Sequence, residues 1–286
     1  MFGAVYYQVI DFADFAHRIA HASLAASTSN NEHVRMAIQS LATRQRRHGG
    51  ELVFAIEGGV QERRLVLHPG YKASRRTREP GTSVNELRTR MSYIYDLVRC
   101  IRGRIIQCPG FEGDDAIAAF VHANQDRTLI FSADSDLWSL IDYQHVDIYV
   151  SGDEILTQTD IDKKFTHGKF ELPPSNVQMF KAVFGDATDD VPGVPHLRRS
   201  TVADCFATPQ LEPGRFFTLV DQLCNDKTKK TIAAYRDQIA TMYEVVRLRR
   251  EGPIVTQACA GDRVTLEALC RNHGVTDLGP QINELT

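Results

Sequence analysis

Residues 5–20 read VYYQVIDFADFAHRIA and set the pattern for much of the chain. The apolar run at 5–10 is typical of a buried β-strand, Asp11 follows it directly, and Phe15 and Ile19 then recur at helical spacing. A strand, an acidic residue and a helix in this order predict an α/β fold with a parallel sheet. Ligands bind such sheets beyond the carboxyl ends of the strands, which is where Asp11 would lie.

The same arrangement recurs at two other places in the chain. The apolar run LVFAI at 52–56 precedes Glu57, and LIFSA at 129–133 precedes Asp134. Acids that follow parallel strands are expected to converge on one edge of one sheet. So many negative charges need cations or protons, and hard divalent cations with oxygen ligands point to phosphate chemistry. Nine carboxylates in five clusters are candidates: Asp11, Glu57, Glu112 with Asp114 and Asp115, Asp134 with Asp136, and Asp186 with Asp189.

The composition limits the class of protein. The chain has 286 residues, 43% of them hydrophobic, which suffices for one large domain or two modest ones. Its net charge of −3 names no partner, but residues 61–104 carry eleven Lys and Arg against four acidic residues. This basic segment suggests that a polyanion is held by one part of the protein and cut at another, and a solvated helix face explains the charge equally well.

The cysteines and the N-terminus bear on the cellular compartment. None of the six cysteines forms a CxxC pair or a metal-finger spacing, which predicts reduced thiols in a cytoplasmic protein. No signal peptide is visible, and no apolar run approaches the length of a membrane span. We therefore expect a cytoplasmic protein without membrane contact.

Periodicity and turn residues predict the other elements. Helices are expected at 14–25, 32–47, 83–102, from about 112, at 176–184 and at 200–206, and strands at 63–67, 128–133 and 146–150. The rest of the chain to residue 286 is expected to be mostly helical. A change in character near residue 170 predicts two parts, an α/β domain at 1–170, in which about 70–104 is basic, and a helical subdomain at 171–286.

Three acidic motifs carry the predicted chemistry. FEGDDAIA at 111–118 puts two acids on the first turn of a helix, SADSDL at 132–137 follows a strand, and GDATDDVPGV at 185–194 joins two carboxylates to a loop that enters a helix. Each has an ordinary explanation as well: the helix dipole, an Asx turn and an acidic connection between helices. The third motif suits nucleic-acid phosphate, because such loops expose backbone N–H groups at a helix N-terminus.

These motifs resemble, in order, the Glu-x-Asp-Asp, Asp-x-Asp and Gly-Asp-x-x-Asp-Asn motifs of the 5′-nuclease family of flap endonucleases and 5′→3′ exonucleases. The match is closest in type to stand-alone phage enzymes and to the 5′-nuclease domain of bacterial DNA polymerase I. Three more segments resemble the family: VIDFADFAHRIAHA at 9–22, with Arg18 at the expected helical position, FAIEG at 54–58, where the acid is usually Asp, and LHPGYKASRR at 67–76. The resemblance covers about residues 5–206. It implies a PIN-like α/β sheet domain, a basic helical arch and a C-terminal helix–three-turn–helix subdomain.

The resemblance also implies roles for individual residues. Asp11, Glu57, Glu112 and Asp114 would hold two or more Mg²⁺ or Mn²⁺ ions with Asp115 nearby, Asp134 and Asp136 would complete that cluster, and Asp186 and Asp189 would form its outer part. Lys72 and Arg75 would act on the scissile phosphate as catalytic residues. The residues implied in DNA binding are Tyr71, Arg76, Gly193, Val194, Arg198 and Arg199, and packing against the core is the alternative for Tyr71.

Two positions depart from the family pattern. Asp190 stands where the family usually has Asn, and His196-Leu197-Arg198-Arg199 replaces its Gly-x-Gly. The second change puts in question the K⁺ ion that the family often binds at this loop, and direct arginine–phosphate contacts would substitute.

The sequence therefore predicts a metal-dependent 5′→3′ exonuclease or flap endonuclease. It would hydrolyse phosphodiesters near the 5′ ends of DNA or RNA primers during replication, in the host cytoplasm if phage-encoded. Its partners would be DNA with 5′ ends or flaps, RNA–DNA hybrids, and a separate polymerase. Two alternatives stay open. The duplex-binding loop argues against a PIN-type ribonuclease, and the complete acidic set argues against a non-catalytic structure-specific DNA-binding protein.

Overall fold

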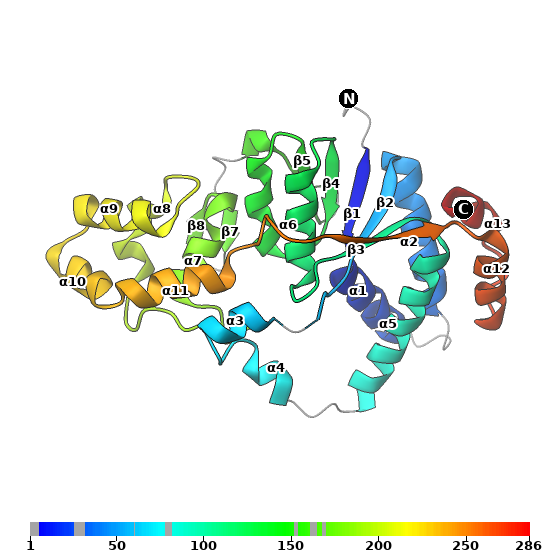
Figure 1. Ribbon diagram of the computed structural model, residues 1–286, viewed down its shortest axis with the longest axis horizontal. Helices are drawn as coiled ribbons and strands as arrows, with labels where there is room; N and C mark the ends of the chain where they lie inside the picture. The colour runs from blue at the N-terminus through cyan, green and yellow to red at the C-terminus, as the bar shows by residue number, and fades with distance from the viewer. Residues whose placement is uncertain are drawn as a thin grey trace.

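The computed structural model describes residues 6–25, 32–59, 61–77, 82–151, 154–160, 165–167 and 170–286. Its centre is a seven-stranded sheet in the order β6-β5-β4-β1-β2-β3-β9 (Figure 1). The five inner strands are parallel, and the edge strands β6 and β9 are antiparallel to their neighbours. The strands are β1 (Tyr7–Asp11), β2 (Glu51–Ala55), β3 (Arg102–Gln107), β4 (Thr128–Phe131), β5 (Val146–Ser151), β6 (Glu154–Leu156) and β9 (Val255–Ala260). The predicted α/β sheet is confirmed.

Helices cover both faces of this sheet. Successive residues of a strand point to opposite faces, so Val9 and Ile10 of β1 belong to different apolar cores. The core around Ile10 is completed by α1 (Phe12–Ala25), α2 (Glu32–His48), α5 (Thr82–Cys100), α12 (Arg263–Asn272) and α13 (Gly279–Leu285). The core around Val9 is completed by α6 (Gly113–Ala123) and the 3₁₀ helix η1 (Ser135–Asp142). Burial on both faces explains why these strands read as continuous apolar runs.

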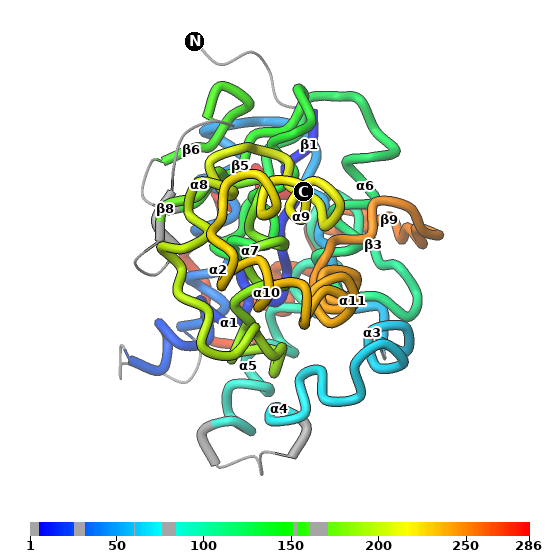
Figure 2. Tube along the Cα trace, turned by 90° about the vertical axis from the view of Figure 1, so that its left-hand side faces the viewer, coloured from blue at the N-terminus to red at the C-terminus, as the bar shows by residue number. Residues whose placement is uncertain are grey.

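A third core lies in the helical part of the chain. It is formed mainly by α7 (Val177–Phe184), α8 (Ala203–Phe206), α9 (Pro213–Leu223), α10 (Asp226–Ala234) and α11 (Arg236–Val246), and the 3₁₀ helix η4 (Arg199–Thr201) precedes α8. Figure 2 shows helices of this part in front of the sheet. The remaining short elements are α3 (Glu62–Leu67), α4 (Ala73–Thr77), η2 (Gln158–Asp160), η3 (Pro174–Asn176) and the hairpin of β7 (Phe165–His167) and β8 (Phe170–Leu172). None of the described helices is both long and apolar enough to cross a membrane.

Several predicted elements were wrong. The expected strand at 63–67 is the helix α3, in which Arg64 is buried. The expected helix at 83–102 ends at Cys100, and the next residues form β3, which was not predicted. The expected helix at 200–206 is divided between η4 and α8. The rest of the chain is mostly helical, as predicted, but residues 255–260 form the strand β9 beside β3, which was not predicted.

The two-part division near residue 170 stays a prediction, with one qualification from the structure. After α11 the chain returns to the sheet as β9, and α12 and α13 then pack in the same core as α1 and α2. The last part of the predicted helical subdomain therefore shares a core with the α/β part. The segment expected as an arch contains α4 and α5, and residues 78–81 between them lie outside the described residues.

Candidate active site

The structure brings the predicted acids to one edge of the sheet. Asp11 ends β1, Glu57 lies just beyond β2, and the N-termini of α6 and η1 supply the next two clusters. The loop after α7 adds Asp186 and Asp189 from the helical part. Charge interactions connect the clusters in pairs: Asp11 with Asp134, Glu57 with Asp11 and Glu112, Asp114 with Asp136, and Asp189 with Glu112. The parallel strand order produces this convergence, as the sequence pattern predicts.

Several of these acids also serve the local backbone. Glu112 and Asp115 form a reciprocal capping box at the start of α6. Asp134 caps η1 by accepting from the backbone N–H of Asp136 at 2.9 Å. Asp186 accepts from the N–H of Thr188 at 2.8 Å in the same way. The ordinary explanations by caps and Asx turns therefore hold beside the functional one, because one carboxylate has two oxygens and several lone pairs.

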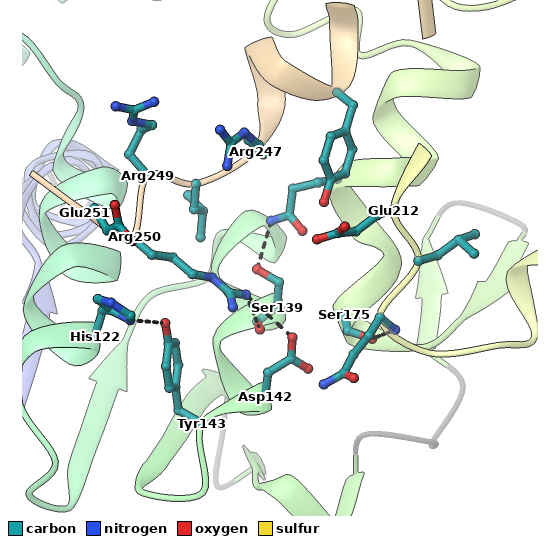
Figure 3. A pocket seen from close by; sticks show the side chains of 15 residues that line it. His122, Ser139, Asp142, Tyr143, Ser175, Glu212, Arg247, Arg249, Arg250 and Glu251 are labelled. Carbon is teal, nitrogen blue, oxygen red and sulfur yellow. Dashed lines mark hydrogen bonds and ion pairs between the residues drawn. The ribbon is translucent and has the colours of Figure 1, made fainter. Parts of the chain in front are cut away.

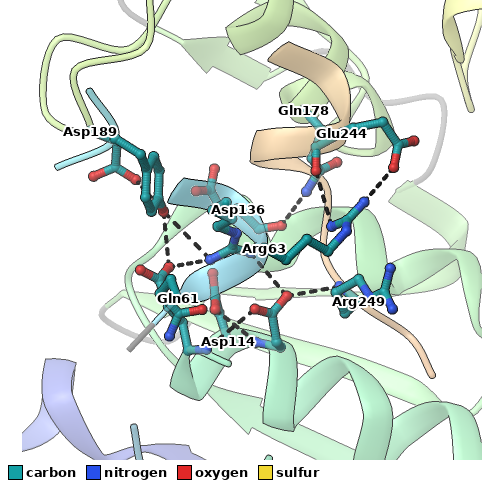
Figure 4. A network of polar contacts seen from close by, with 12 residues as sticks. Gln61, Arg63, Asp114, Asp136, Gln178, Asp189, Glu244 and Arg249 are labelled. Carbon is teal, nitrogen blue, oxygen red and sulfur yellow. Dashed lines mark hydrogen bonds and ion pairs between the residues drawn. The ribbon is translucent and has the colours of Figure 1, made fainter. Parts of the chain in front are cut away.

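Arg64 lies buried among the acids, with only 3% of its surface exposed. Its guanidinium pairs with Glu112 through Nη1 and with Asp115 Oδ1 through Nη2, the latter at 2.9 Å. The backbone N–H of Arg249 donates to the same Asp115 oxygen at 2.8 Å. Figure 4 shows Arg249 in this network with Asp114. The charge of Arg64 thus offsets two carboxylates that could not otherwise stay ionised away from water.

The residues expected at the scissile phosphate reach the same acids. Lys72 Nζ lies 2.5 Å from Glu112 Oε1 and 3.7 Å from Asp189 Oδ2, and Arg75 Nη2 lies 2.8 Å from Asp189 Oδ1. The backbone N–H of Lys72 donates to the Asp189 carbonyl at 2.9 Å, which fixes the start of α4 against the loop after α7. The base of the predicted arch is therefore attached to the acidic edge.

Tyr71 is buried beside Lys72, and its ring belongs to the core of the helical part. Its hydroxyl donates to Glu112 Oε2 at 3.0 Å and to Asp189 Oδ2 at 3.3 Å. A ring with 3% of its surface exposed has no free face for a nucleic-acid base. The structure favours the packing role for Tyr71 over the stacking role that the resemblance implies.

Lys181 on α7 neutralises the other side of the acidic edge. Its ammonium lies 2.5 Å from Asp136 Oδ1 and 2.8 Å from Asp186 Oδ2, and the side chain is largely buried. The two acids come from η1 and from the loop after α7. One buried lysine therefore connects the sheet part to the helical part across the candidate site.

The acids differ in how readily they ionise. Burial raises the pKa of Asp11 to about 6, and burial together with the charge of Glu112 raises the pKa of Glu57 to about 7. Burial likewise raises the pKa of Asp136 to about 7 even though Lys181 opposes it. At Glu112, by contrast, burial is outweighed by Arg64 and Lys72, which lower the pKa. Some carboxylates of the site are therefore kept ionised by cations of the protein, and others are not.

The donor set fits Mg²⁺ or Mn²⁺, because it consists of carboxylate oxygens. Within the described part of the chain, neither Asp11 nor Glu57 forms an ion pair, and their raised pKa values are the electrostatic strain that a divalent cation would relieve. No three His, Cys, Asp or Glu side chains among the described residues are arranged to hold a metal ion. The amino groups of Lys72 and Lys181 lie between the acids instead, so side chains must turn before an ion is coordinated.

The loop at 185–194 is closed by its own backbone. Asp186 and Val191 exchange two backbone hydrogen bonds of 2.9 Å, and the Val194 N–H donates to Val183 at 2.8 Å. A side chain on Gly193 would meet the Phe184 backbone at 2.4 Å, and Val194 is buried. Tight packing therefore accounts for both residues, and their contact with DNA stays a prediction.

Of the positions that depart from the family pattern, Asp190 lies within this loop and residues 196–199 follow it. Asp190 has a φ of 56° and accepts from the N–H and hydroxyl of Ser74 at 2.8 and 2.7 Å, which attaches the loop to α4. Arg198 and Arg199 are exposed, as a phosphate contact requires, and Arg199 lies over the rings of Phe180 and Phe184. The side chain of Arg76 lies outside the described residues.

The family of the chain follows from its sequence profile. The profile of the 5′-3′ exonuclease N-terminal resolvase-like domain matches residues 7–166, which is more than half of the 286 residues. The chain belongs to the 5′-3′ exonuclease family. This confirms the resemblance inferred from the motifs and classes the protein with hydrolytic nucleases.

Individual relatives agree with this family. The chain is 29% identical over 198 residues to DNA polymerase I of Rhizobium leguminosarum, an alignment that covers 67% of this chain and 18% of the relative. It is 24% identical over 255 residues to the thermostable DNA polymerase I of Thermus filiformis, covering 86% and 29%. The 5′-3′ exonuclease family member thus spans less than a third of the length of these relatives.

Solved structures share the fold. The zinc-bound T5 5′-exonuclease superposes with a TM-score of 0.65 at 15% identity, covering 94% of this chain and 98% of the other. The catalytic core of Rad2 in complex with DNA substrate gives a TM-score of 0.59 at 14% identity, covering 97% and 93%. At such identities the likeness shows the fold alone. It confirms the predicted 5′-nuclease-like α/β architecture for this exonuclease family member.

Two cations of the site were missed by the sequence reasoning. Arg64 was counted only as part of a basic segment. The apolar residues that follow it, beginning with Leu65, suggested a strand at 63–67. Lys181 interrupts the apolar helix VQMFKAVF, and that interruption was the one available signal. A charged residue inside an apolar helix indicates a buried partner, because lysine is rarely buried unpaired.

The chain also contains a cavity of about 730 Å³ that none of the nine acids lines, although its lining residues Arg249 and Gln178 donate hydrogen bonds to Asp115 and to the Asp136 carbonyl. Figure 3 shows Arg247, Arg249 and Arg250 along one part of its wall, with Asp142 and Glu212 among the other lining residues. The Arg250 guanidinium lies 3.5 Å from Asp142, so part of this charge is already paired. Acids and arginines in similar number give the cavity no clear preference for the charge of a ligand.

Proposed function

We propose that this chain is a metal-dependent 5′→3′ exonuclease and flap endonuclease that hydrolyses phosphodiesters near the 5′ ends of DNA. The observation that carries the proposal is the meeting of Lys72 and Arg75 with Glu112 and Asp189 at the acidic edge. Cations beside an excess of carboxylates suit a phosphate that is held by both metal ions and basic side chains. Membership of the 5′-3′ exonuclease family supports this chemistry.

Divalent ions bound here would activate a water molecule and offset the charge of the phosphoryl group during transfer. Asp11 and Glu57 would supply oxygen ligands, since no described cation pairs with them. Lys72 and Arg75 would bind and orient the scissile phosphate. Arg64 would hold Glu112 in place, and Lys181 would do the same for Asp136 and Asp186.

The substrate and partners belong to the same proposal. A T5 flap endonuclease of this fold has been described in complex with DNA and metal ions, and the Rad2 core with DNA substrate. For this chain we infer a 5′-ended or flapped duplex, with RNA–DNA hybrids as a further substrate. The exposed Arg198 and Arg199 would contact the duplex backbone. Replication beside a polymerase, in the cytoplasm, is the inferred setting, supported by the DNA polymerase I relatives.

Cleavage of a 5′-labelled flap duplex in Mg²⁺ tests the proposal. Wild-type protein should release short labelled products, and Asp11→Asn should lower the rate by about 100-fold or more, because a metal ligand is lost. The matched control is Asp147→Asn. Asp147 pairs with Arg127 near the N-terminal end of β5, whereas Asp11 lies at the carboxyl end of β1. This control should cleave at the wild-type rate.

Other outcomes would contradict the proposal in distinguishable ways. Duplex binding in EDTA without cleavage in Mg²⁺ or Mn²⁺, by a protein shown to be folded, would favour a non-catalytic DNA-binding protein. Cleavage of single-stranded RNA but not of the flap duplex would favour a PIN-type ribonuclease. Equal rates for Asp11→Asn and the wild type would remove Asp11 from the metal site.

A further inference from the structure

A second cavity, of about 320 Å³, lies between α2 and the sheet, and none of the nine acids lines it. The C-terminal half of α2 forms one wall with Ser40, Thr43 and Arg44. Phe131 at the end of β4 and Tyr149 on β5 form the other, with ring centroids 5.2 Å apart. The cavity thus combines an aromatic floor with a polar rim, and its size suits a small ligand.

The charged side chains described along this cavity are basic. Arg44 and Arg47 line it, and none of the described residues that line it is acidic. Both arginines lie near His48, because burial and then the charges of Arg47 and Arg44 lower the pKa of His48. Two neighbouring guanidinium groups suit the binding of an anion, which accepts hydrogen bonds from both.

Arg44 carries the clearest sign that a ligand is expected. Its guanidinium lies 4.6 Å from the Phe131 ring centroid and 5.7 Å from that of Phe15, and Nη1 donates to Ser40 Oγ at 3.2 Å. Its Nε is buried without a hydrogen-bond partner, and Arg44 forms no ion pair with any described residue. Burial, and then the nearby charge of Arg18, lower its pKa to about 10. A half-buried arginine normally has a carboxylate or phosphate beside it.

We propose that this cavity binds a phosphate group through Arg44 and Arg47, with the hydroxyls of Ser40 and Thr43 as further donors. Planar guanidinium groups bind phosphate through paired N–H donors, and hydroxyls add neutral hydrogen bonds. The phosphate belongs either to the backbone of bound DNA or to a free nucleotide or inorganic phosphate. The first source rests on the proposed nuclease function, and the second does not.

The test compares two variants of α2. Arg44→Met combined with Arg47→Met removes both cations and keeps apolar stems of similar length, so that packing against Phe131 is retained. The matched control is Arg46→Met on the same turn. Arg46 pairs with Glu284 of α13 at 2.9 Å and does not line the cavity, and Arg46→Met removes one positive charge where the double variant removes two. Circular dichroism establishes that all proteins are folded.

Two binding measurements, both in EDTA so that no cleavage occurs, identify the source of the phosphate. The first is the shift in melting temperature with inorganic phosphate and with a nucleoside monophosphate, against chloride at equal ionic strength. The second is affinity for a flap duplex over a range of salt concentrations. Wild type and Arg46→Met should bind alike in both. Losing charge-assisted hydrogen bonds should weaken phosphate binding by the double variant by about tenfold or more.

Each result decides part of the proposal. Loss of the phosphate-induced shift with an unchanged salt slope for DNA would assign the cavity to a free phosphate ligand. A salt slope that falls by about 0.9 for each lost contact would assign it to the DNA backbone. If the double variant matches Arg46→Met in both measurements, the cavity binds no phosphate and the proposal is wrong. A failure to cleave DNA would leave these binding results intact, so the two proposals fail separately.

Discussion

Asp11 and Glu57, which follow β1 and β2, differ from Glu112 at α6 and Asp186 in the loop after α7. Asp11 and Glu57 have no ion pair within the described residues, and their pKa values are raised to about 6 and about 7. Glu112 and Asp186 are paired with Arg64, Lys72 and Lys181, and their pKa values are lowered even though burial opposes this. The two strand-end acids thus lack a paired cation, whereas the protein supplies Glu112 and Asp186 with cations that lower their pKa values.

This difference teaches how a site can gather nine carboxylates and still fold. Internal cations keep Glu112 and Asp186 ionised, whereas burial raises the pKa values of Asp114, Asp115 and Asp189 as it does those of Asp11 and Glu57. A divalent ion would be attracted to those positions, because that is where protons are held most strongly. The following experiments test this contrast, from the largest expected effect to the smallest.

Replacing Arg64 should destabilise the fold more than the other changes, because Arg64 is the buried cation beside Glu112 and Asp115. Arg64→Met leaves Glu112 and Asp115 buried without their cation, which should lower the free energy of unfolding by about 3–5 kcal/mol. Urea unfolding at neutral pH in EDTA measures this loss. Arg63→Met is the control, because Arg63 pairs with Glu244 at 2.5 Å in a partly exposed position and should cost less than about 1 kcal/mol. Equal losses would show that Arg64 is not the counter-ion of the buried acids.

Replacing Lys72 should separate its proposed binding of the scissile phosphate from its pairing with Glu112. In Lys72→Ala, turnover on the flap substrate should fall about 100-fold, because a cation is lost from the phosphate site. The apparent affinity for Mg²⁺ should rise, because Lys72 no longer competes for Glu112. A titration of cleavage rate against Mg²⁺ gives both values. Lys230→Ala on the surface of α10 should leave both unchanged. A simultaneous fall in Mg²⁺ affinity would contradict the competition.

The pH dependence of the free energy of unfolding should show which carboxylates have raised pKa values in the folded protein. The pKa values of Asp11, Glu57 and Asp136 are raised to about 6, 7 and 7, so the folded protein holds more protons than the unfolded chain between the ordinary carboxyl range and pH 7. In EDTA, the free energy of unfolding should therefore fall as pH rises through about 5 to 7. The lowered pKa values of Glu112 and Asp186 act below this window.

Mg²⁺ should reduce that loss of stability at the upper end of the range, since it binds the deprotonated acids. Urea unfolding at several pH values, with EDTA or with Mg²⁺, makes the comparison. If the free energy of unfolding in EDTA instead rises with pH from about 5 to 7, these carboxylates are neutralised by cations of the folded protein. Curves that are identical with and without Mg²⁺ would contradict metal binding by the folded state.

The sequence could predict the acidic edge because three acids directly follow apolar strands. Asp11, Glu57 and Asp134 each stand at such a strand end, and parallel strands place their carboxyl ends together. The α/β class and the family could be inferred from these motifs for the same reason. Strand burial on two faces leaves a continuous apolar run, which is a strong local signal.

Other features depend on contacts that no local pattern contains. β3 reads RGRIIQ, in which only Ile105 and Ile106 are apolar, and β9 has Cys259 as its one buried residue. Short strands with few apolar residues, such as the inner strand β3 and the edge strand β9, lack the pattern that identifies a strand. The pairing of Arg64 with buried acids could not be predicted either, because its partners Glu112 and Asp115 lie about fifty positions further along the chain. Long-range pairing of charges leaves no periodicity in the sequence.

The strand β9 has a consequence for the order in which this protein can be assembled during synthesis. The ribosome releases β3 long before β9, with the whole helical part between them. Until residue 260 has emerged, β3 presents an open row of backbone donors and acceptors, and the core around Ile10 lacks Leu266 and Ile282. Open edges of this kind attract other unfinished chains. The nascent polypeptide must therefore pass through a stage in which its sheet is incomplete on one side.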